Sequence, residues 1–214
     1  MIEQLVPDFV AAVETTADVG SDLLFPSETD VISNAVTKRR IEFGAVRWCA
    51  RQALAELGIG PVPILPGERG APQWPLGVVG SMTHCTGYRA AVVARSDRLR
   101  GLGIDAEPNE PLPAGVLAVI SRPEERDHLA ELTRTRPGHW DRLLFTIKES
   151  VYKTWFPLTA RWLDFTEASV RIDPIARTFE VRLLADPAAA DLTALAGRFG
   201  WDDAIVASAI AVPS

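Results

Sequence analysis

Long helical segments and short apolar strands recur in the same order twice along this chain, and this order constrains the fold more than any other feature. In the first half, an amphipathic helix predicted at 33–57 ends at Gly58 and precedes a loop crowded with proline and glycine at 61–80. In the second half, a helix predicted at 139–156 is likewise followed by apolar strands. We therefore expect an α+β protein with an internal structural duplication and a boundary near residues 96–101.

The remaining elements are predicted from alternation and from turn residues. YRAAVVAR (88–95) and LRGLGIDAE (99–107) are separated by the polar SDR, which predicts a hairpin. FEVRLLA (179–185) and AIVASAIAV (204–212) predict a second strand pair in the same way. The first 16 residues predict a short leader helix.

Composition excludes several classes of protein. The 214 residues are 47% hydrophobic and 23% charged, which is typical of a globular chain with a sizeable core. No apolar run approaches the roughly 18 residues that a membrane span requires, and no basic leader precedes an apolar stretch. The two cysteines lie in no CxxC or Cys/His cluster. We therefore expect a reduced, cytoplasmic protein with no membrane partner.

Charge is distributed unevenly along the chain. Residues 1–30 contain seven acids and no Lys or Arg, whereas acids and bases nearly balance elsewhere. The net charge of −6 and the absence of a strongly basic stretch argue against a nucleic-acid partner. The local exception is KRRIEFGAVRWCAR (38–51), where a helical wheel places Arg40, Arg47 and Arg51 on one side. Such a row either binds a small polyanion or forms a solvated helix face, and the sequence leaves both open.

The segment FTIKESVYKTW (145–155) places Glu149 between Lys148 and Lys153 on the second long helix. Its apolar stripe consists of Leu144, Ile147, Val151 and Trp155. Glu149 and Lys153 are four residues apart, so an ordinary surface ion pair is one interpretation. Lys148 lies at the edge of the apolar stripe, so we expect its ammonium group to have a specific partner.

The segment GLGIDAEPNE (101–110) carries Asp105 and Glu107 at the end of an apolar strand. Residues two apart on a strand point to the same face, so these carboxylates converge. They repel each other unless a cation or a proton lies between them, and hard oxygen ligands suit Mg²⁺. With the later Lys/Glu pair and the earlier Arg helix, the chain has the parts that a phosphoryl-transfer site needs.

GIDAE followed by FTIKESVYK resembles the signature of the Sfp-type 4′-phosphopantetheinyl transferases, in an actinobacterial-like form. In that family a glycine-led DxE precedes a KExxxK motif by about 40 residues, as it does here. RRIEFGAVRWCARQAL resembles the family's Arg-rich helix, GERGAPQWP its proline loop, and SMTHCTGYRAAVV its Ser/His turn and following strand. Matching segments run from about residue 38 to 163, and Thr146 stands where serine or cysteine is more frequent.

The resemblance implies a reaction and a fold. The reaction is transfer of the 4′-phosphopantetheine arm of coenzyme A to a serine of an apo acyl carrier or peptidyl carrier protein, with release of adenosine 3′,5′-bisphosphate. The fold is a pseudo-dimer of similar halves, 1–100 with the Arg-rich helix and coenzyme A-binding loop and 101–214 with the DxE and KExxxK motifs. The site would lie between the halves of a monomer. Fatty-acid, polyketide and nonribosomal-peptide carriers are not distinguished.

The resemblance also implies roles for individual residues. Asp105, Glu107 and Glu149 would bind Mg²⁺ or Mn²⁺ against the pyrophosphate. Glu149 would also deprotonate the carrier serine, either directly or through a water. Lys148 and Lys153 would neutralise phosphate charge.

Residues of the first half would bind the phosphates of coenzyme A, according to the same resemblance. Three contacts are implied: Arg69, Ser81 and His84. For the 3′-phosphate, the family spacing favours Arg39 with Arg47, whereas the helical wheel favours Arg40 with Arg47, and both pairs stay open. A lone histidine such as His84 is also commonly a packing residue.

Two other functions fit parts of the pattern. A metal-dependent phosphodiesterase or nuclease could use the same carboxylates to activate water, although the acidic overall charge counts against it. A non-catalytic coenzyme A or carrier-binding module would need the ligand contacts but no base. Replacing Glu149 by Gln separates this module from an enzyme, because only an enzyme would lose turnover.

Overall fold

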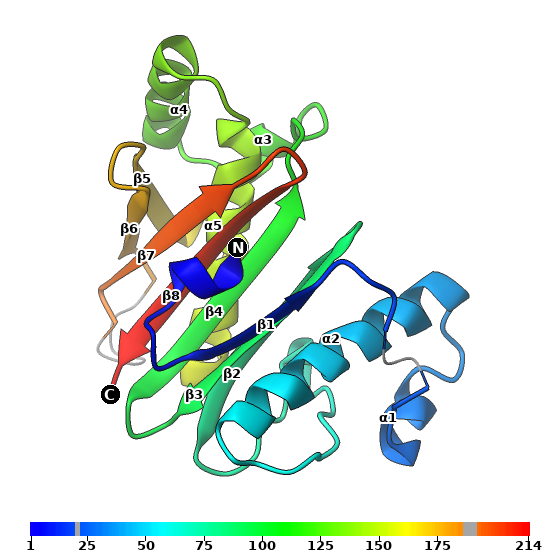
Figure 1. The fold of residues 1–214 in the computed structure, drawn as a ribbon. Helices are drawn as coiled ribbons and strands as arrows, with labels where there is room; N and C mark the ends of the chain where they lie inside the picture. The colour runs from blue at the N-terminus through cyan, green and yellow to red at the C-terminus, as the bar shows by residue number, and fades with distance from the viewer. Residues whose placement is uncertain (20–21, 186–191) are drawn as a thin grey trace.

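The computed structural model of the chain describes residues 1–19, 22–185 and 192–214. Its strands form two antiparallel sheets, with the orders β1-β3-β2 and β4-β8-β7-β6-β5 (Figure 1). The described strands are β1 (Ala11–Thr15), β2 (Val78–Cys85), β3 (Tyr88–Arg95), β4 (Leu99–Pro108), β5 (Ala168–Asp173), β6 (Thr178–Leu183), β7 (Ala194–Trp201) and β8 (Ile205–Pro213). The described helices are α1 (Pro26–Val31), α2 (Thr37–Glu56), α3 (Val116–Ile120), α4 (Pro123–Thr135) and α5 (Trp140–Thr159), with short 3₁₀ helices at Ile2–Leu5, Glu68–Gly70 and Phe165–Glu167. No helix in these ranges combines the length and apolar character that a membrane-spanning segment needs.

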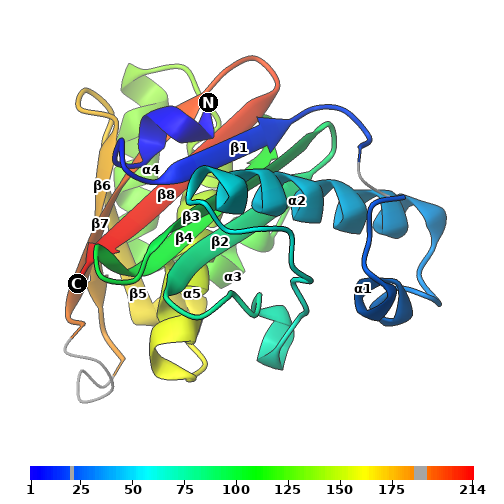
Figure 2. The same cartoon turned by 60° about the horizontal axis from the view of Figure 1, so that its bottom comes forward.

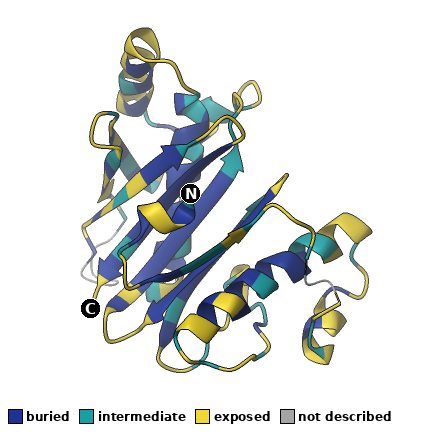
Figure 3. Ribbon diagram, viewed as in Figure 1, coloured by how far each residue is buried: buried dark blue, intermediate teal, exposed yellow. Residues whose placement is uncertain are grey.

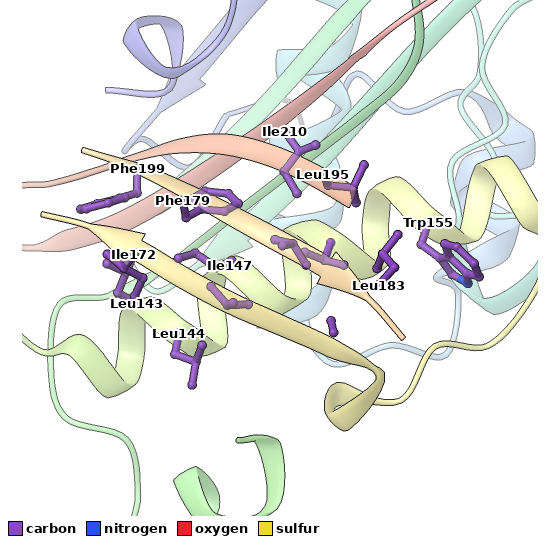
Figure 4. Close-up of a cluster of buried hydrophobic side chains, with 14 of the residues drawn as sticks. Leu143, Leu144, Ile147, Trp155, Ile172, Phe179, Leu183, Leu195, Phe199 and Ile210 are labelled. Atoms are coloured by element: carbon purple, nitrogen blue, oxygen red, sulfur yellow. The ribbon is translucent and has the colours of Figure 1, made fainter. Parts of the chain in front are cut away.

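One long helix packs on each sheet (Figures 1 and 2). α2 contacts the three-stranded sheet through small side chains, since Cys49, Ala50 and Ala53 are buried with Ala91 and Val93 of β3. α5 instead buries large side chains against the five-stranded sheet (Figure 4), and its members of this cluster include Leu143, Leu144, Ile147, Val151 and Trp155. The predicted α+β class, with a long helix on each of two antiparallel sheets, is confirmed.

A further buried cluster joins the two sheets on the faces that the helices leave free. It contains Val92 of β3, Ile104 and Ala106 of β4, and Ala207 of β8, each fully buried. Figure 3 shows β4 and β8 buried along most of their length. Because both faces of these strands are covered, their sequences read as nearly continuous apolar runs.

Two hydroxyl groups connect the edges of the sheets. The backbone N–H of Ile104 donates to Ser81 Oγ at 3.1 Å, and that of Ala106 donates to Thr83 Oγ1 at 3.2 Å. These bonds satisfy donors on β4 that would otherwise be buried without a partner. They also hold Asp105, which lies between the two donors, at the junction of the two halves.

Four sequence predictions of local structure were wrong. The predicted pairing of 179–185 with 204–212 does not form, because β7 lies between β6 and β8 in the sheet. The leader helix is a 3₁₀ turn followed by β1, which pairs with β3. The predicted hairpin of 88–95 with 99–107 does not form, because β3 pairs with β2 and β4 pairs with β8. The Ser/His segment is strand β2 and not a turn, and the actual turn is the Thr86-Gly87 connection that follows it. Alternating apolar residues identify a strand but do not identify its partner.

Candidate functional site

A pocket of about 490 Å³ lies between α2, the proline-rich loop, β2 and α5. Both halves of the chain therefore contribute walls to it. Its lining includes these predicted site residues: Arg39, Arg47, Arg69, Ser81, His84, Glu149 and Lys153.

Helix α5 approaches β4 so closely that only glycine fits between them. A Cβ atom at Gly103 would lie 2.1 Å from Thr154 Oγ1 and 2.2 Å from the carbonyl oxygen of Ser150. Ser150 and Thr154 are fully buried and directly follow Glu149 and Lys153 in sequence. The small residues on this face of α5 thus bring the KExxxK motif against the strand that carries the DxE motif.

Asp105 is the best-held carboxylate of the site. It is 4% exposed, and its Oδ1 accepts hydrogen bonds from Lys153 Nζ at 2.7 Å and Thr83 Oγ1 at 3.0 Å. Its Oδ2 is buried and has no hydrogen-bond partner among the described residues. A buried carboxylate oxygen without a donor is unfavourable, so this atom is suited to accept a ligand that the protein itself does not supply.

Burial and the negative charge of Asp105 shift the pKa values of the other two acids, Glu107 and Glu149. Burial, and then the charge of Asp105, raise the pKa of Glu107 to about 7. The same two causes, in the same order, raise the pKa of Glu149 above its ordinary value. Burial and the Asp105 charge therefore both disfavour further negative charge on these two acids.

The carboxylate oxygens of the site are chemically suited to bind a hard divalent cation. Among the described residues, no three His, Cys, Asp or Glu side chains are arranged so that they could hold a metal ion by themselves. The unpartnered Oδ2 of Asp105 and the mutual repulsion of the carboxylates nevertheless indicate a place for positive charge. Mg²⁺ commonly binds one or two protein carboxylates and completes its shell with water and substrate phosphate, so a preformed cage is not required.

The wall of the pocket opposite Glu149 and Lys153, called the cationic wall below, contains Arg39, Arg47 and His84, and Glu42 Oε2 lies 3.6 Å from His84 Nε2. Arg39 Nη1 donates to His84 Nε2 at 2.7 Å, and burial and then the Arg39 charge lower the pKa of His84 to about 4. Arg47 lies with its guanidinium 3.1 Å from the centre of the Phe43 ring, and its Nε donates to the carbonyl oxygen of Ile64 at 2.9 Å. Burial lowers the pKa of Arg47 to about 10, so the group stays charged at neutral pH.

Two further predicted contacts line the pocket from loop and strand. Ser81 Oγ accepts a bond from β4, but a hydroxyl can donate at the same time, so it can still contact a ligand. Arg69 lies with its guanidinium 5.0 Å from the ring centre of Trp162, across the boundary between the halves. Arg39 and Arg40 are both exposed, but only Arg39 is part of the pocket lining. The structure thus brings together Arg39 and Arg47, the pair favoured by the family spacing.

The predicted role of Lys148 at a phosphate was wrong. Its side chain is 1% exposed, and its Nζ donates to Glu125 Oε2 at 2.8 Å and to the carbonyl oxygens of Phe165 and Ala168 at 2.7 and 2.9 Å. An ammonium group has three donors, and all three are used. Lys148 therefore ties α5 to α4 and to the start of β5, on a side of the helix that does not face the pocket.

A buried acid that the sequence analysis missed organises the Arg-rich helix. Glu28 of α1 is fully buried and accepts bonds from Arg51 Nη1 at 3.1 Å and from the backbone N–H of Ile64 at 2.8 Å. Arg47 Nε lies 3.7 Å from the same carboxylate. Arg51 therefore faces neither a ligand nor solvent, so neither interpretation of the row of Arg40, Arg47 and Arg51 holds for Arg51. The available signal was the segment FPSE, since Pro26 and Glu28 occupy the first turn of a short helix.

Comparisons with known proteins agree with this arrangement. A family model described as the 4′-phosphopantetheinyl transferase N-terminal domain matches residues 27–94, and one described as the 4′-phosphopantetheinyl transferase superfamily matches residues 101–207. The chain is 52% identical to the 4′-phosphopantetheinyl transferase Svp of Streptomyces mobaraensis over 99% of this chain and 89% of that protein. It is 49% identical to the 4′-phosphopantetheinyl transferase PptT of Mycobacterium tuberculosis over 86% and 84% of the two chains. It is 52% identical to the 4′-phosphopantetheinyl transferase Npt of Nocardia iowensis over 81% and 77%.

Proposed function

The chain belongs to the 4′-phosphopantetheinyl transferase superfamily, and from this premise we propose that it transfers the 4′-phosphopantetheine arm of coenzyme A to a serine of an apo carrier protein. One observation carries the proposal at the level of this chain. A single pocket has Arg39, Arg47 and His84 on one wall and Glu149 and Lys153 on the other. Three relatives are named 4′-phosphopantetheinyl transferases and are about half identical to this chain over most of its length. Their similarity favours a transferase over a phosphodiesterase or a binding module.

The cationic wall would bind the adenosine end of coenzyme A. Arg39 and Arg47 can donate paired N–H groups to the 3′-phosphate, since guanidinium forks match phosphate oxygens. His84 is neutral at pH 7 in the free protein, so it can offer a hydrogen bond without adding fixed charge. Arg69 and Ser81 would contact the pyrophosphate from the proline loop and β2. These contacts hold the substrate along the pocket with its pyrophosphate toward α5.

A divalent cation, Mg²⁺ or Mn²⁺, would be held by Asp105, Glu107 and Glu149. When bound, it supplies positive charge that offsets the pyrophosphate and stabilises the leaving phosphate. Lys153, already 2.7 Å from Asp105, adds a second cation at the same place. Both cations act in a partly buried site, where electrostatic interactions are stronger than in water.

Glu149 is proposed as the base that activates the carrier serine. A serine hydroxyl is a weak nucleophile at neutral pH and needs a base within hydrogen-bond reach. The raised pKa of Glu149 makes it a better proton acceptor than an ordinary glutamate. As the serine oxygen bonds to the phosphorus next to the pantetheine, its proton passes to Glu149. The bond from that phosphorus to the adenosine bisphosphate breaks, and adenosine 3′,5′-bisphosphate leaves with the electron pair.

The reaction can be tested by mass. Apo acyl carrier and peptidyl carrier proteins are incubated with coenzyme A, Mg²⁺ and the protein, and the carriers are then weighed. We expect the carrier mass to increase by one phosphopantetheine. The Glu149→Gln variant should still bind coenzyme A but lose turnover by about 10²–10⁴-fold, as removal of a general base does. Absence of added mass on every carrier tried would refute the transferase proposal.

The metal assignment has a separate test. Asp105→Ala should lower the rate steeply when Mg²⁺ is limiting, and excess Mg²⁺ should restore part of it. A wild-type rate for this variant at limiting Mg²⁺ would contradict the assignment. We also propose that the protein acts as a monomer, because both walls of the pocket come from one chain; light scattering would detect a stable dimer. The cytoplasmic location stays a proposal that rests on the composition of the sequence.

A further inference from the structure

Arg142, in the first turn of α5, uses all three of its guanidinium nitrogens on the end of β4 and the segment that follows it. Its Nη1 donates to Glu107 Oε2 at 3.2 Å, its Nε donates to the carbonyl oxygen of Glu110 at 3.0 Å, and its Nη2 donates to that of Pro111 at 3.0 Å. The residue is 9% exposed. Nothing in the KExxxK or DxE pattern points to it, because it lies seven residues before Glu149.

The bond to Glu107 has a parallel at Asp105. In Asp105, protein donors occupy Oδ1 and leave Oδ2 without a partner among the described residues. In Glu107, the bond from Arg142 occupies Oε2 and not Oε1. Each acid of the DxE motif is therefore held by one oxygen, and the other oxygen can accept a ligand. Groups that orient ligating carboxylates in this way tune a metal site without touching the metal.

We propose that Arg142 is a positioning residue for the candidate cation site, acting through Glu107; this inference rests on the proposed function. The Glu107 side chain is 24% exposed, so without Arg142 it could rotate toward solvent and away from the neighbouring acids that repel it. The positively charged guanidinium of Arg142 opposes that rotation, because it donates a hydrogen bond to the Glu107 carboxylate. Lysine could not replace it fully, because one ammonium on a flexible stem cannot reproduce a planar fork that reaches three acceptors.

A neighbouring residue provides a matched control. Asp141 Oδ2 accepts a hydrogen bond from the backbone N–H of Leu112 at 2.9 Å, so Asp141 fixes the same segment. As an acid, Asp141 donates no hydrogen bond to Glu107, whose carboxylate accepts one from Arg142. Loss of Asp141 therefore loosens the segment alone, whereas loss of Arg142 also frees Glu107.

The experiment measures Mn²⁺ binding by electron paramagnetic resonance of the free ion, with coenzyme A present and no carrier protein. Wild type, Arg142→Ala, Arg142→Lys and Asp141→Ala are compared, and thermal melting confirms that each variant is folded. We expect Arg142→Ala to weaken Mn²⁺ binding by about 10–100-fold, the usual effect of losing an outer-shell partner. Arg142→Lys should fall between Arg142→Ala and wild type, and Asp141→Ala, which removes the acceptor for the Leu112 N–H, should stay within about twofold of wild type.

A double-mutant cycle separates positioning from general loosening. In a Glu107→Gln background, Arg142→Ala should change Mn²⁺ binding by less than about twofold, because the group on which it acts is already altered. Equal binding by wild type and Arg142→Ala would overturn the inference while leaving the proposed function intact. Equal weakening by Asp141→Ala would overturn it too, since segment order would then be the cause. If wild type itself fails to bind Mn²⁺, the metal assignment falls, and this inference falls with it.

Discussion

Replacing Gly103 by alanine tests whether the contact between β4 and α5 sets the geometry of the active site. The added Cβ would lie 2.1 Å from Thr154 Oγ1 and 2.2 Å from the carbonyl oxygen of Ser150. The first of these atoms can rotate away, but the second belongs to the helix backbone. α5 must therefore move, and Glu149 and Lys153 must move with it, because each is the neighbour of a displaced residue.

The magnitude follows from these distances. Restoring an ordinary contact from 2.2 Å requires a shift of about 1 Å, and a misplacement of that size can lower a rate by about 100-fold. Overpacking a tight interior typically costs about 1–3 kcal/mol, and a backbone clash belongs near the upper end. For a chain of this length, about 3 kcal/mol corresponds to a decrease of about 6–12 °C in Tm.

The same strand offers a matched control at Gly101. A Cβ at this position would meet Leu158 Cδ1 at 2.9 Å and the other Leu158 atoms at 3.4 Å or more. That contact is with the end of a flexible side chain, so Gly101→Ala should change Tm by no more than about 2–4 °C. Alanine also lowers the entropy of the unfolded chain, which offsets part of the cost in both variants.

The assay combines thermal melting with the initial rate of carrier modification measured by intact mass. We expect Gly103→Ala to lose both stability and rate, and Gly101→Ala to stay near wild type in both. If the two variants have Tm values within about 2 °C and rates within about twofold of each other, the close approach of α5 does not set the geometry.

Three further predictions concern charged or titratable side chains inside and outside the pocket. Lys148→Met leaves Glu125 buried without its partner, so it should lower the unfolding free energy measured in urea by about 3–5 kcal/mol. The KM for coenzyme A should stay near the wild-type value. A large change in KM without lost stability would contradict this structural role. Arg39→Ala should raise the KM for coenzyme A about 10–100-fold, the value of a hydrogen bond to a charged group, and Arg40→Ala should stay within about twofold; equal effects would contradict the assignment. His84 has a pKa of about 4 in the folded protein, below its ordinary 6.5, so the folded state binds fewer protons than the unfolded state between these values. Stability should therefore fall as the pH drops from about 6.5 to 4, with a shallower slope in His84→Gln, and equal slopes in urea titrations would refute the cause.

Local patterns predicted the long helices and the motif strand well. The helices expected at 33–57 and 139–156 are observed at Thr37–Glu56 and Trp140–Thr159, and the strand expected at 99–107 is β4. Each prediction depended on the spacing of apolar residues, which is set within a single element. The DxE and KExxxK motifs were readable for the same reason, since their residues are close together in sequence.

Strand partners and charge partners were not readable in this way. β3 was expected to pair with the strand after it but pairs with β1 and β2, and β1 was taken for a helix. The partner of Lys148 is Glu125, and the partner of Arg51 is Glu28, each 23 residues away on another helix. Such pairings depend on which elements meet after folding, and the sequence of one element does not contain that information.

By itself the sequence determined the fold class, the family signature and the identity of the carboxylates that converge. The tertiary structure alone decided which charged residues face the pocket. A helical wheel gives the angle of Lys148, Arg47 or Arg142 around its helix but not the element that lies against that angle. A buried charge needs an opposite charge or a hydrogen-bond partner. The packing of neighbouring elements therefore pairs Lys148 with Glu125, away from the pocket, and pairs Lys153 with Asp105 in the site.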